Sequence, residues 1–354
     1  MEQKRLGDIA TYINGYAFKP EDRGSTGLPI IRIQDLTGNA YDLGFYDGKY
    51  PEKIEINDGD VLISWSASLG VYIWNRGKGL LNQHIFKVVF DKCEVNKQYF
   101  VFAVKHKLKE MELKTHGATM KHIVKKDFDN TVIPFPTVEK QADIAYILSK
   151  IESIVEFRQQ ELQQLDDLIK ARFVELFGDP VINSMGWKKA LIGDDCFVTK
   201  LAGFEYTQYI NYEDSGDVVM VKAQNVKNGK LNRKELSFIS NEVSDSLPRS
   251  QLAPGDVVMT YVGANIGDVA IIDNEYKYHL APNVAKIRPD SERYNSIYFM
   301  YMLMLLNAYI VKNSADTAKA ALGMERIRKL NVFVPPIELQ NQFADFVASV
   351  DKSK

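Results

Sequence analysis

Residues 138–177 read VEKQADIAYILSKIESIVEFRQQELQQLDDLIKARFVELF, and they contain no glycine or proline until Gly178-Asp179-Pro180 ends the run. Steps of four and three residues separate the members of one series: Ile144, Leu148, Ile151, Val155, Arg158, Leu162, Leu165, Ile169, Arg172 and Leu176. This heptad spacing predicts a coiled-coil helix of roughly 58 Å whose seam packs on another helix. The alternative is a long amphipathic helix that lies across its own domain.

The sequence on either side of this helix is repeated. Three pairs of segments show it: 6–9 (LGDI) with 191–194 (LIGD), 59–64 (GDVLIS) with 255–260 (GDVVMT), and 120–123 (MKHI) with 324–327 (MERI). Internal repeats of this kind indicate two copies of one structural unit. We therefore predict a domain at 1–137, a central helical spacer at 138–178, a second domain at 179–336, and a shortened distal helical region at 337–354.

Each copy combines short β-branched runs with a helical segment. In the first copy, strands are predicted at Ile30–Ile33, Val61–Ser64, Val71–Trp74, Ile85–Phe90 and Val132–Phe135. A longer period, with Phe100, Val104 and Leu108 on one side, predicts a helix over Tyr99–Leu113. The expected fold is therefore α+β: two tandem domains of mixed sheet and helices, separated by the long helix.

Composition excludes several classes of protein. The chain has 354 residues, 45% of them apolar, with 44 Lys+Arg against 46 Asp+Glu, as in an ordinary globular protein. We find no apolar run long enough to cross a membrane and no signal peptide, so we expect a cytoplasmic protein without membrane contact. The two cysteines, Cys93 and Cys196, form no CxxC motif, and the five histidines lack metal-ligand spacing, so no metal site is expected.

Motifs for catalysis are missing from the sequence. It has no G-x-x-x-x-G-K-[ST] loop, no G-x-S-x-G elbow and no H-E-x-x-H pair. Pro335-Pro336 lies between Val334 and Ile337, which does not match the Asn/Asp-Pro-Pro-Tyr/Phe clamp of a DNA amino-methyltransferase. We expect no catalytic residues and no cofactor in this chain.

Charge is distributed unevenly along the chain. Between Lys87 and Lys126 ten lysines face four acidic residues, whereas the central helix carries eight acidic and five basic residues. Lysines near a phosphate backbone release counterions and set the affinity for DNA. A basic domain face of this kind favours DNA binding, although a solvated lysine-rich helix flank would look the same.

Residues able to contact DNA recur at matching places in both copies. Arg32 and Gln34 alternate with isoleucines, so we expect them on the face opposite the core, and Lys222 and Gln224 are their counterparts. The candidates in the first copy are Arg32, Gln34, Ser64, Trp65, Asn82, Gln83, His84, Lys114, His116, Lys121, His122 and Lys125. Those in the second are Lys200, Tyr206, Lys222, Gln224, Asn225, Tyr261, Asn265, Asn283, Lys319 and Arg326. Each could instead be a turn residue or a polar strand edge.

The order of these segments resembles a known family. It runs from the Leu-Gly-Asp opening through 59–63 (GDVLI), 117–123 (GATMKHI) and 133–136 (IPFP) to a helix with Gln141 that ends in 165–180 (LDDLIKARFVELFGDP). The whole chain resembles the DNA-sequence specificity (S) subunit of a Type I restriction-modification system. The resemblance implies a non-catalytic subunit that binds a bipartite double-stranded DNA target with two target-recognition domains.

The resemblance also implies partners. Two modification subunits would bind S-adenosylmethionine and methylate adenine, and restriction subunits would use ATP and Mg²⁺. One departure is the segment after Pro335-Pro336, which is shorter than the helix after the first copy. A truncated or silent-cassette specificity protein that binds DNA without assembling, and a two-module protein-interaction scaffold, therefore remain as alternatives.

Overall fold

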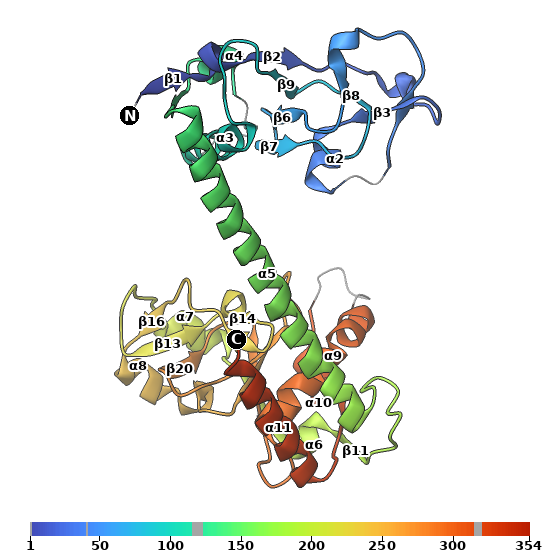
Figure 1. The fold of residues 1–354 in the computed structure, drawn as a ribbon. Coiled ribbons are helices and arrows are strands. Elements are labelled where there is room, and N and C mark those ends of the chain that lie inside the picture. Colours follow the sequence, from blue (N-terminus) through green and yellow to red (C-terminus); the bar gives the residue numbers. More distant parts are fainter. Residues whose placement is uncertain (1, 40–41, 115–122, 315–320) are drawn as a thin grey trace. The chain divides into compact units, whose positions relative to one another are not determined.

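The computed structural model describes residues 2–39, 42–114, 123–314 and 321–354, without the side chains of 112–114 and 312–314. The chain divides into two compact units, residues 1–158 (unit 1) and residues 159–354 (unit 2). One continuous helix, α5 (Val138–Phe177), begins in unit 1 and ends in unit 2 (Figure 1). Its bounds confirm the helix predicted from the heptad pattern.

Unit 1 is built from short strands and a few helices before α5. Its strands are β1 (Gln3–Arg5), β2 (Thr11–Asn14), β3 (Leu28–Ile31), β4 (Phe45–Tyr46), β5 (Glu55–Ile56), β6 (Val61–Ser64), β7 (Gly70–Ile73), β8 (Gly79–Leu81), β9 (Ile85–Val89) and β10 (Val132–Pro134). Its other helices are α1 (Leu6–Ile9), α2 (Ile33–Thr37), α3 (Lys97–Lys114) and α4 (Lys125–Asp129), with 3-10 turns η1 (Pro20–Asp22) and η2 (Glu52–Ile54).

Unit 2 repeats this order with additions. Its strands are β11 (Lys189–Leu191), β12 (Cys196–Lys200), β13 (Val218–Val221), β14 (Val226–Lys227), β15 (Lys230–Leu231), β16 (Phe238–Ile239), β17 (Gln251–Leu252), β18 (Val257–Thr260), β19 (Val269–Ile271), β20 (Lys277–Leu280), β21 (Val284–Pro289) and β22 (Asn331–Phe333). Its helices are α6 (Ile192–Asp195), α7 (Gly203–Tyr209), α8 (Asn241–Ser246), α9 (Ser296–Ser314), α10 (Met324–Arg328) and α11 (Ile337–Asp351), with η3 (Ala223–Asn225) and η4 (Pro248–Ser250).

The two units share one sheet topology. An antiparallel sheet in the order β2-β9-β6-β7 corresponds to β12-β21-β18-β19. A second sheet, β4-β3-β8-β5 with β3 and β8 parallel, corresponds to β16-β13-β20-β17. The pair β1-β10 corresponds to β11-β22. The repeat in the sequence is therefore a repeat of architecture, and the β14-β15 hairpin accounts for part of the extra length of unit 2.

Alternating side chains on the central strands of the antiparallel sheets build two cores per unit. In β18, Val257 and Met259 belong to one apolar cluster and Val258 belongs to another. In β6, Val61 and Ile63 likewise face away from Leu62. A strand buried on both faces has a continuous apolar run instead of an alternating one, which matches the sequences of both strands.

A buried glutamine fixes the start of the helix that follows each copy. Gln141 of α5 accepts a hydrogen bond from Asn96 N (2.9 Å) and donates to Pro136 O (2.8 Å). Gln340 of α11 accepts from Asn295 N (2.9 Å) and donates to Pro335 O (2.8 Å). Both glutamine side chains are fully buried. The helices α5 and α11 therefore start in the same way, each against its own domain.

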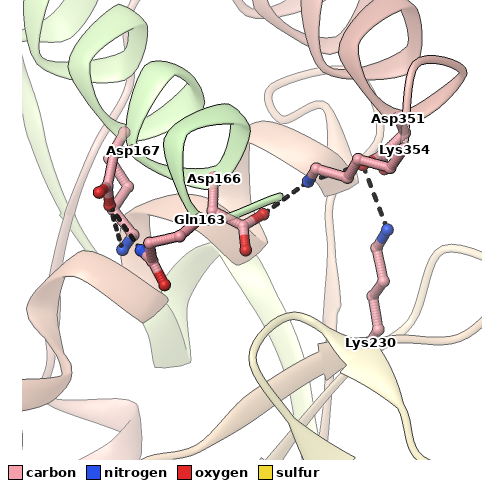
Figure 2. A network of polar contacts seen from close by, with 7 residues as sticks. Gln163, Asp166, Asp167, Lys230, Asp351 and Lys354 are labelled. Atoms are coloured by element: carbon pink, nitrogen blue, oxygen red, sulfur yellow. Dashed lines mark hydrogen bonds and ion pairs between the residues drawn. The ribbon is translucent and has the colours of Figure 1, made fainter. Parts of the chain in front are cut away.

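Within unit 2, α11 and α9 pack against the C-terminal part of α5 (Figure 1). The rings of Phe173 and Phe343 meet edge to face at 5.4 Å, and Phe173 stacks on Tyr298 at 5.5 Å. Lys354 Nζ reaches Asp166 Oδ1 (2.6 Å) at the end of the same contact, as Figure 2 shows. This part of the predicted seam is confirmed to pack on helices. Its most buried residues are Ile169, which belongs to the predicted series, and Phe173 and Phe177, which each follow a predicted position, Arg172 or Leu176, by one residue.

The predicted strands of unit 1 lie within two residues of those observed, and one of the differences is informative. The strand predicted at Ile30–Ile33 ends at Ile31, and α2 begins at Ile33. Asp35 Oδ2 accepts a hydrogen bond from Arg32 N (2.8 Å), which pairs the backbone N–H group at the helix start. A carboxylate three residues after Arg32 therefore converts the expected extended chain into a helical turn.

Candidate nucleic-acid interface

An aromatic residue follows the central strand of the antiparallel sheet in each unit. In unit 1 it is Trp65, which stacks on Phe86 with 5.5 Å between ring centroids. His84 lies edge-on to the same ring at 4.9 Å. Trp65 Nε1 donates a hydrogen bond to Asn14 Oδ1 (3.2 Å), at the last residue of β2. Three residues from three separate segments thus meet at one corner of the sheet.

Unit 2 builds the same corner from different side chains. Tyr261 follows β18, and Lys200 Nζ lies 5.4 Å from the centre of its ring. Lys200 is the last residue of β12, as Asn14 is the last residue of β2. Lys200 pairs with Ala285 and Asn14 pairs with Phe86, each the second residue of the neighbouring strand, so the two positions are equivalent. The Tyr261 side chain is half-buried, and this burial raises the pKa of its hydroxyl.

The backbone closes both corners in the same way. Trp65 N donates to His84 O (3.2 Å), and Tyr261 N donates to Asn283 O (2.9 Å). Ile123 N donates to Trp65 O (3.0 Å), and Leu322 N donates to Tyr261 O (2.8 Å). We refer to Asn14, Trp65 and His84 as corner 1, and to Lys200, Tyr261 and Asn283 as corner 2.

These hydrogen bonds correct the predicted alignment of the repeat. The sequence suggested that Ile123 corresponds to Ile327, but the structure pairs Ile123 with Leu322. Ile327 of α10 instead matches Phe128 of α4, and both are fully buried. The short Met-x-x-Ile motif misled the alignment by five residues. The predicted contacts His116, Lys121, His122 and Lys319, and the side chain of Lys114, lie outside the described residues.

Arg32 does not emerge from a strand as expected. It is buried at the start of α2, where its Nε donates to Asp35 Oδ2 (3.1 Å), so its guanidinium is held within the unit. Gln34 is exposed in the first turn of α2. Lys222 and Gln224 occupy the matching places before and within η3, which confirms that the two pairs are equivalent.

Lys222 joins an aromatic cluster on unit 2. Its Nζ donates to Ser237 Oγ (2.9 Å) and lies 5.9 Å from the ring centre of Tyr212, which is 6.0 Å from the ring of Tyr206. Burial raises the pKa of Tyr212. Exposed Gln224 donates to Glu235 Oε2 (3.2 Å). Cations beside aromatic faces suit contact with a nucleic-acid backbone and bases, but only the exposed members of the cluster are placed to make it.

The remaining candidates differ in accessibility. Ser64 is fully buried and donates to Ser68 O (2.6 Å), and Asn225 is buried with its amide bonded to Asn232 O (2.8 Å). Both side chains therefore form their hydrogen bonds inside their own units. Lys125 is exposed but paired with Asp129 Oδ2 (2.6 Å). Asn82 and Gln83 are half-buried, while Asn265 and Arg326 are exposed.

Several lysines between Lys87 and Lys126 are paired with acidic residues, so this stretch offers less unpaired positive charge than its sequence suggests. Ion pairs within unit 1 hold Lys87 to Asp60, Lys105 to Glu152, Lys107 to Glu110 and Lys125 to Asp129. Lys87 also donates to Glu55 O (2.7 Å), which lies on a strand of the other sheet. A net count of charges along the sequence therefore overstates the basic surface among the described residues.

A buried lysine performs the same bridging task in unit 2. Lys286 of β21 corresponds to Lys87, and its Nζ donates to Arg249 O and Gln251 O, both at 2.7 Å. Burial lowers the pKa of Lys286 to about 8. Because Lys286 lies in the antiparallel sheet and Gln251 in the mixed sheet, the ammonium ties the two layers together. We therefore assign Lys286 a structural role in unit 2.

Sequence reasoning missed Asn14 as a member of corner 1. The signal was present, because Asn14 precedes Lys200 by 186 positions, the same offset that separates Gly7 from Gly193. Among the described residues, no group of His, Cys, Asp and Glu side chains has the arrangement of a metal site. Helices long and apolar enough to span a membrane are likewise missing from the described ranges.

Comparison with known proteins identifies one family in both halves of the chain. The family model described as "Type I restriction modification DNA specificity domain" matches residues 1–167 and again residues 186–354. The EcoBI specificity subunit of Escherichia coli is 24% identical, over 95% of this chain and 76% of its own length. The MjaVIII specificity subunit of Methanocaldococcus jannaschii is 25% identical, over 99% of this chain and 86% of its own length.

Two solved structures share the fold. The S subunit of a Type I restriction-modification system from M. genitalium superimposes with a TM-score of 0.57 at 14% identity, over 99% of this chain and 89% of that one. A chain from a structural study of type I R-M complex assembly gives a TM-score of 0.52 at 16% identity, over 99% and 90%. The two repeated α+β domains, the long helix and both family matches lead to one assignment. This chain belongs to the Type I restriction-modification DNA specificity family, whose members are targeting and not catalytic subunits.

Proposed function

We propose that this chain binds a double-stranded DNA target of two separated parts, one part per unit, and thereby directs methylation and restriction by partner subunits. The observation that carries the proposal is the pair of equivalent corners. Their backbone frame is the same, whereas their side chains are Asn14, Trp65 and His84 in one unit and Lys200, Tyr261 and Asn283 in the other. One frame with different polar side chains suits two modules that read different base sequences.

The surrounding residues divide into two roles. We assign exposed lysines such as Lys125 to the DNA backbone, where they supply affinity without regard to sequence. We assign Gln34 and Gln224 to base edges, because both are exposed at the same place in the two units. Arg32, Ser64 and Asn225 support the fold in this proposal, since their polar groups are bonded inside their units.

The first part of α5 is the proposed contact for a modification subunit. Within unit 1 it exposes Tyr146, Ile147, Ile151, Ile154 and Phe157, with between 51% and 69% of each side chain accessible. An exposed apolar stripe on a helix is typical of a surface that binds another helix. We expect two modification subunits, which hold S-adenosylmethionine, and restriction subunits that use ATP and Mg²⁺. The proposed setting is the cytoplasm.

Co-purification with a modification subunit tests the contact on α5. Ile151→Glu with Ile154→Glu should abolish it while leaving the melting temperature of the chain unchanged, because both side chains are exposed. Gln160→Glu, also exposed on α5, is the matched control for added charge. Retention of the modification subunit by the double variant would contradict this surface. No co-purification even with the unaltered chain would favour a truncated or silent-cassette protein.

Exchange of a whole domain tests the recognition function. Residues 181–336 are replaced by the matching part of a relative, and methylated sites are sequenced in cells that also contain the modification subunit. We expect only one part of a two-part site to change. A change in both parts would defeat the two-module proposal. If the purified chain shows no sequence preference for DNA, the alternative of a protein-interaction scaffold is favoured.

A further inference from the structure

One turn has the same unusual backbone in both units. His84 lies between β8 and β9 with φ +71°, and Asn283 lies between β20 and β21 with φ +70°. A left-handed conformation costs most residues with a Cβ atom roughly 1–2 kcal/mol, asparagine less than the others, and glycine avoids this cost. Both turns nevertheless carry a polar side chain. Two copies that share little sequence have kept the strain together with a side chain able to form hydrogen bonds.

Contacts with neighbouring residues fix the conformation of this turn. The carbonyl oxygens of His84 and Asn283 accept hydrogen bonds from the backbone N–H groups of Trp65 and Tyr261, the residues that follow the neighbouring central strands. The His84 ring also rests against the Trp65 ring, 4.9 Å away at 69° between the planes. Strained conformations persist only where the surrounding structure fixes them, and they are frequent where a side chain must be presented to a ligand.

The side chains at the two positions are available for such a ligand. His84 is half-buried, and its Nδ1 is buried without a hydrogen bond to any of the described groups. Asn283 is exposed. Imidazole and carboxamide groups both suit the donors and acceptors on base edges, and an asparagine amide forms two hydrogen bonds with adenine.

We propose that His84 and Asn283 are specificity-determining residues, each contacting a base edge in one part of the DNA target. This inference rests on the proposed function of the chain. It adds that the left-handed turn positions each contact. Replacement by glycine should therefore relieve strain and remove selectivity in the same variant, a combination that a merely structural residue would not give.

The experiment selects DNA from a random pool with the full-length chain bound to its modification subunit, at one stated salt concentration. His84→Gly should lose discrimination at one position in one part of the target, by about 5- to 160-fold, the range of 1–3 kcal/mol. Asn283→Gly should do the same only in the other part. Melting temperatures of both variants should equal or exceed that of the unaltered chain. Asn228→Gly, at φ +49° in the β14-β15 turn, is the matched control and should leave both parts unchanged.

A conservative variant separates reading from folding. His84→Asn keeps a residue that tolerates the left-handed region, so it should fold normally but prefer a different base at the affected position. Unchanged selectivity in His84→Gly and His84→Asn, with the unaltered chain still reading a two-part target, would overturn this inference and leave the proposed function standing. Loss of selectivity at many positions would assign the turn a structural role and would also overturn it. An unaltered chain without any preferred target would defeat both.

Discussion

Replacing the buried glutamine that anchors each post-domain helix tests the frame of the fold. In unit 2 the change is Gln340→Met, which keeps the approximate volume of the side chain and removes its hydrogen bonds. Gln340 accepts from Asn295 N and donates to Pro335 O and Arg293 O, at 2.9, 2.8 and 2.9 Å. The Gln340 side chain is fully buried; its bond to Pro335 O is buried with it, and the bonds with Asn295 N and Arg293 O are partly buried.

The expected cost follows from the number of bonds lost. A buried hydrogen bond contributes about 0.5–1.5 kcal/mol net, so three bonds correspond to about 1.5–4.5 kcal/mol in unit 2. Gln141 forms two such bonds in unit 1, with Asn96 N and Pro136 O, which corresponds to about 1–3 kcal/mol for Gln141→Met. Gln340→Met should therefore be the more damaging change. Exposed Gln164→Met on α5 is the control and should change stability by less than about 0.5 kcal/mol.

Urea unfolding followed by circular dichroism gives the free energies, and amide hydrogen exchange assigns them to a unit. The Asn295 amide should exchange faster in Gln340→Met, and the Asn96 amide faster in Gln141→Met, because each loses its acceptor. Each variant should leave the other amide protected. The reasoning is refuted if both variants are as stable as the control, or if the unit 1 change costs more than the unit 2 change.

Two further perturbations probe the frame and the spacing. Burial holds the pKa of Lys286 at about 8, below its usual 10.5, so the unfolded chain binds more protons between these values and the stability contributed by this residue rises with pH. The stability advantage of the unaltered chain over Lys286→Met should therefore be larger at pH 9.5 than at pH 7.5, in paired urea titrations; a constant difference would contradict the assigned cause. Four residues inserted after Gln159, where α5 is exposed, add about 6 Å at nearly preserved helical phase and should lengthen the unspecified spacer of the target by one or two base pairs. An unchanged spacer in methylation sequencing would mean that α5 does not set the spacing.

Local patterns predicted the long helices α3 and α5 well because their determinants are local. The heptad series and Gly178 defined α5 at both ends, and Gly178 has the positive φ, +76°, that ends many helices. The order of strands was beyond such reasoning, since β2 pairs with β9 and β3 with β8, partners far apart in sequence. Pairing of that kind depends on the packing of whole layers.

The candidate interface was predicted in part, and its errors have physical causes. Alternation over four residues placed Arg32 on a strand, whereas Asp35 three positions later stabilises a helical start. The lysine-rich stretch was counted as free charge, but ion pairs inside unit 1 occupy four of its lysines, among them Lys87. Aromatic residues after the central strands were identified correctly as recurring features. Their neighbours at the strand ends, Asn14 above all, required the three-dimensional repeat.

The repeat also explains why frame and surface vary differently between the units. Positions that hold a unit together keep their chemistry: a buried glutamine in the first turn of the helix after each domain, a lysine that bridges the two sheets, and a left-handed residue at the same turn. Positions at the corners do not, since Asn14 is matched by Lys200 and His84 by Asn283. Side chains that only supported the sheet would be under the same packing constraints in both units and should resemble each other. Different side chains at these corners, on a backbone frame that both units share, fit the proposal that two modules read different sequences with one architecture.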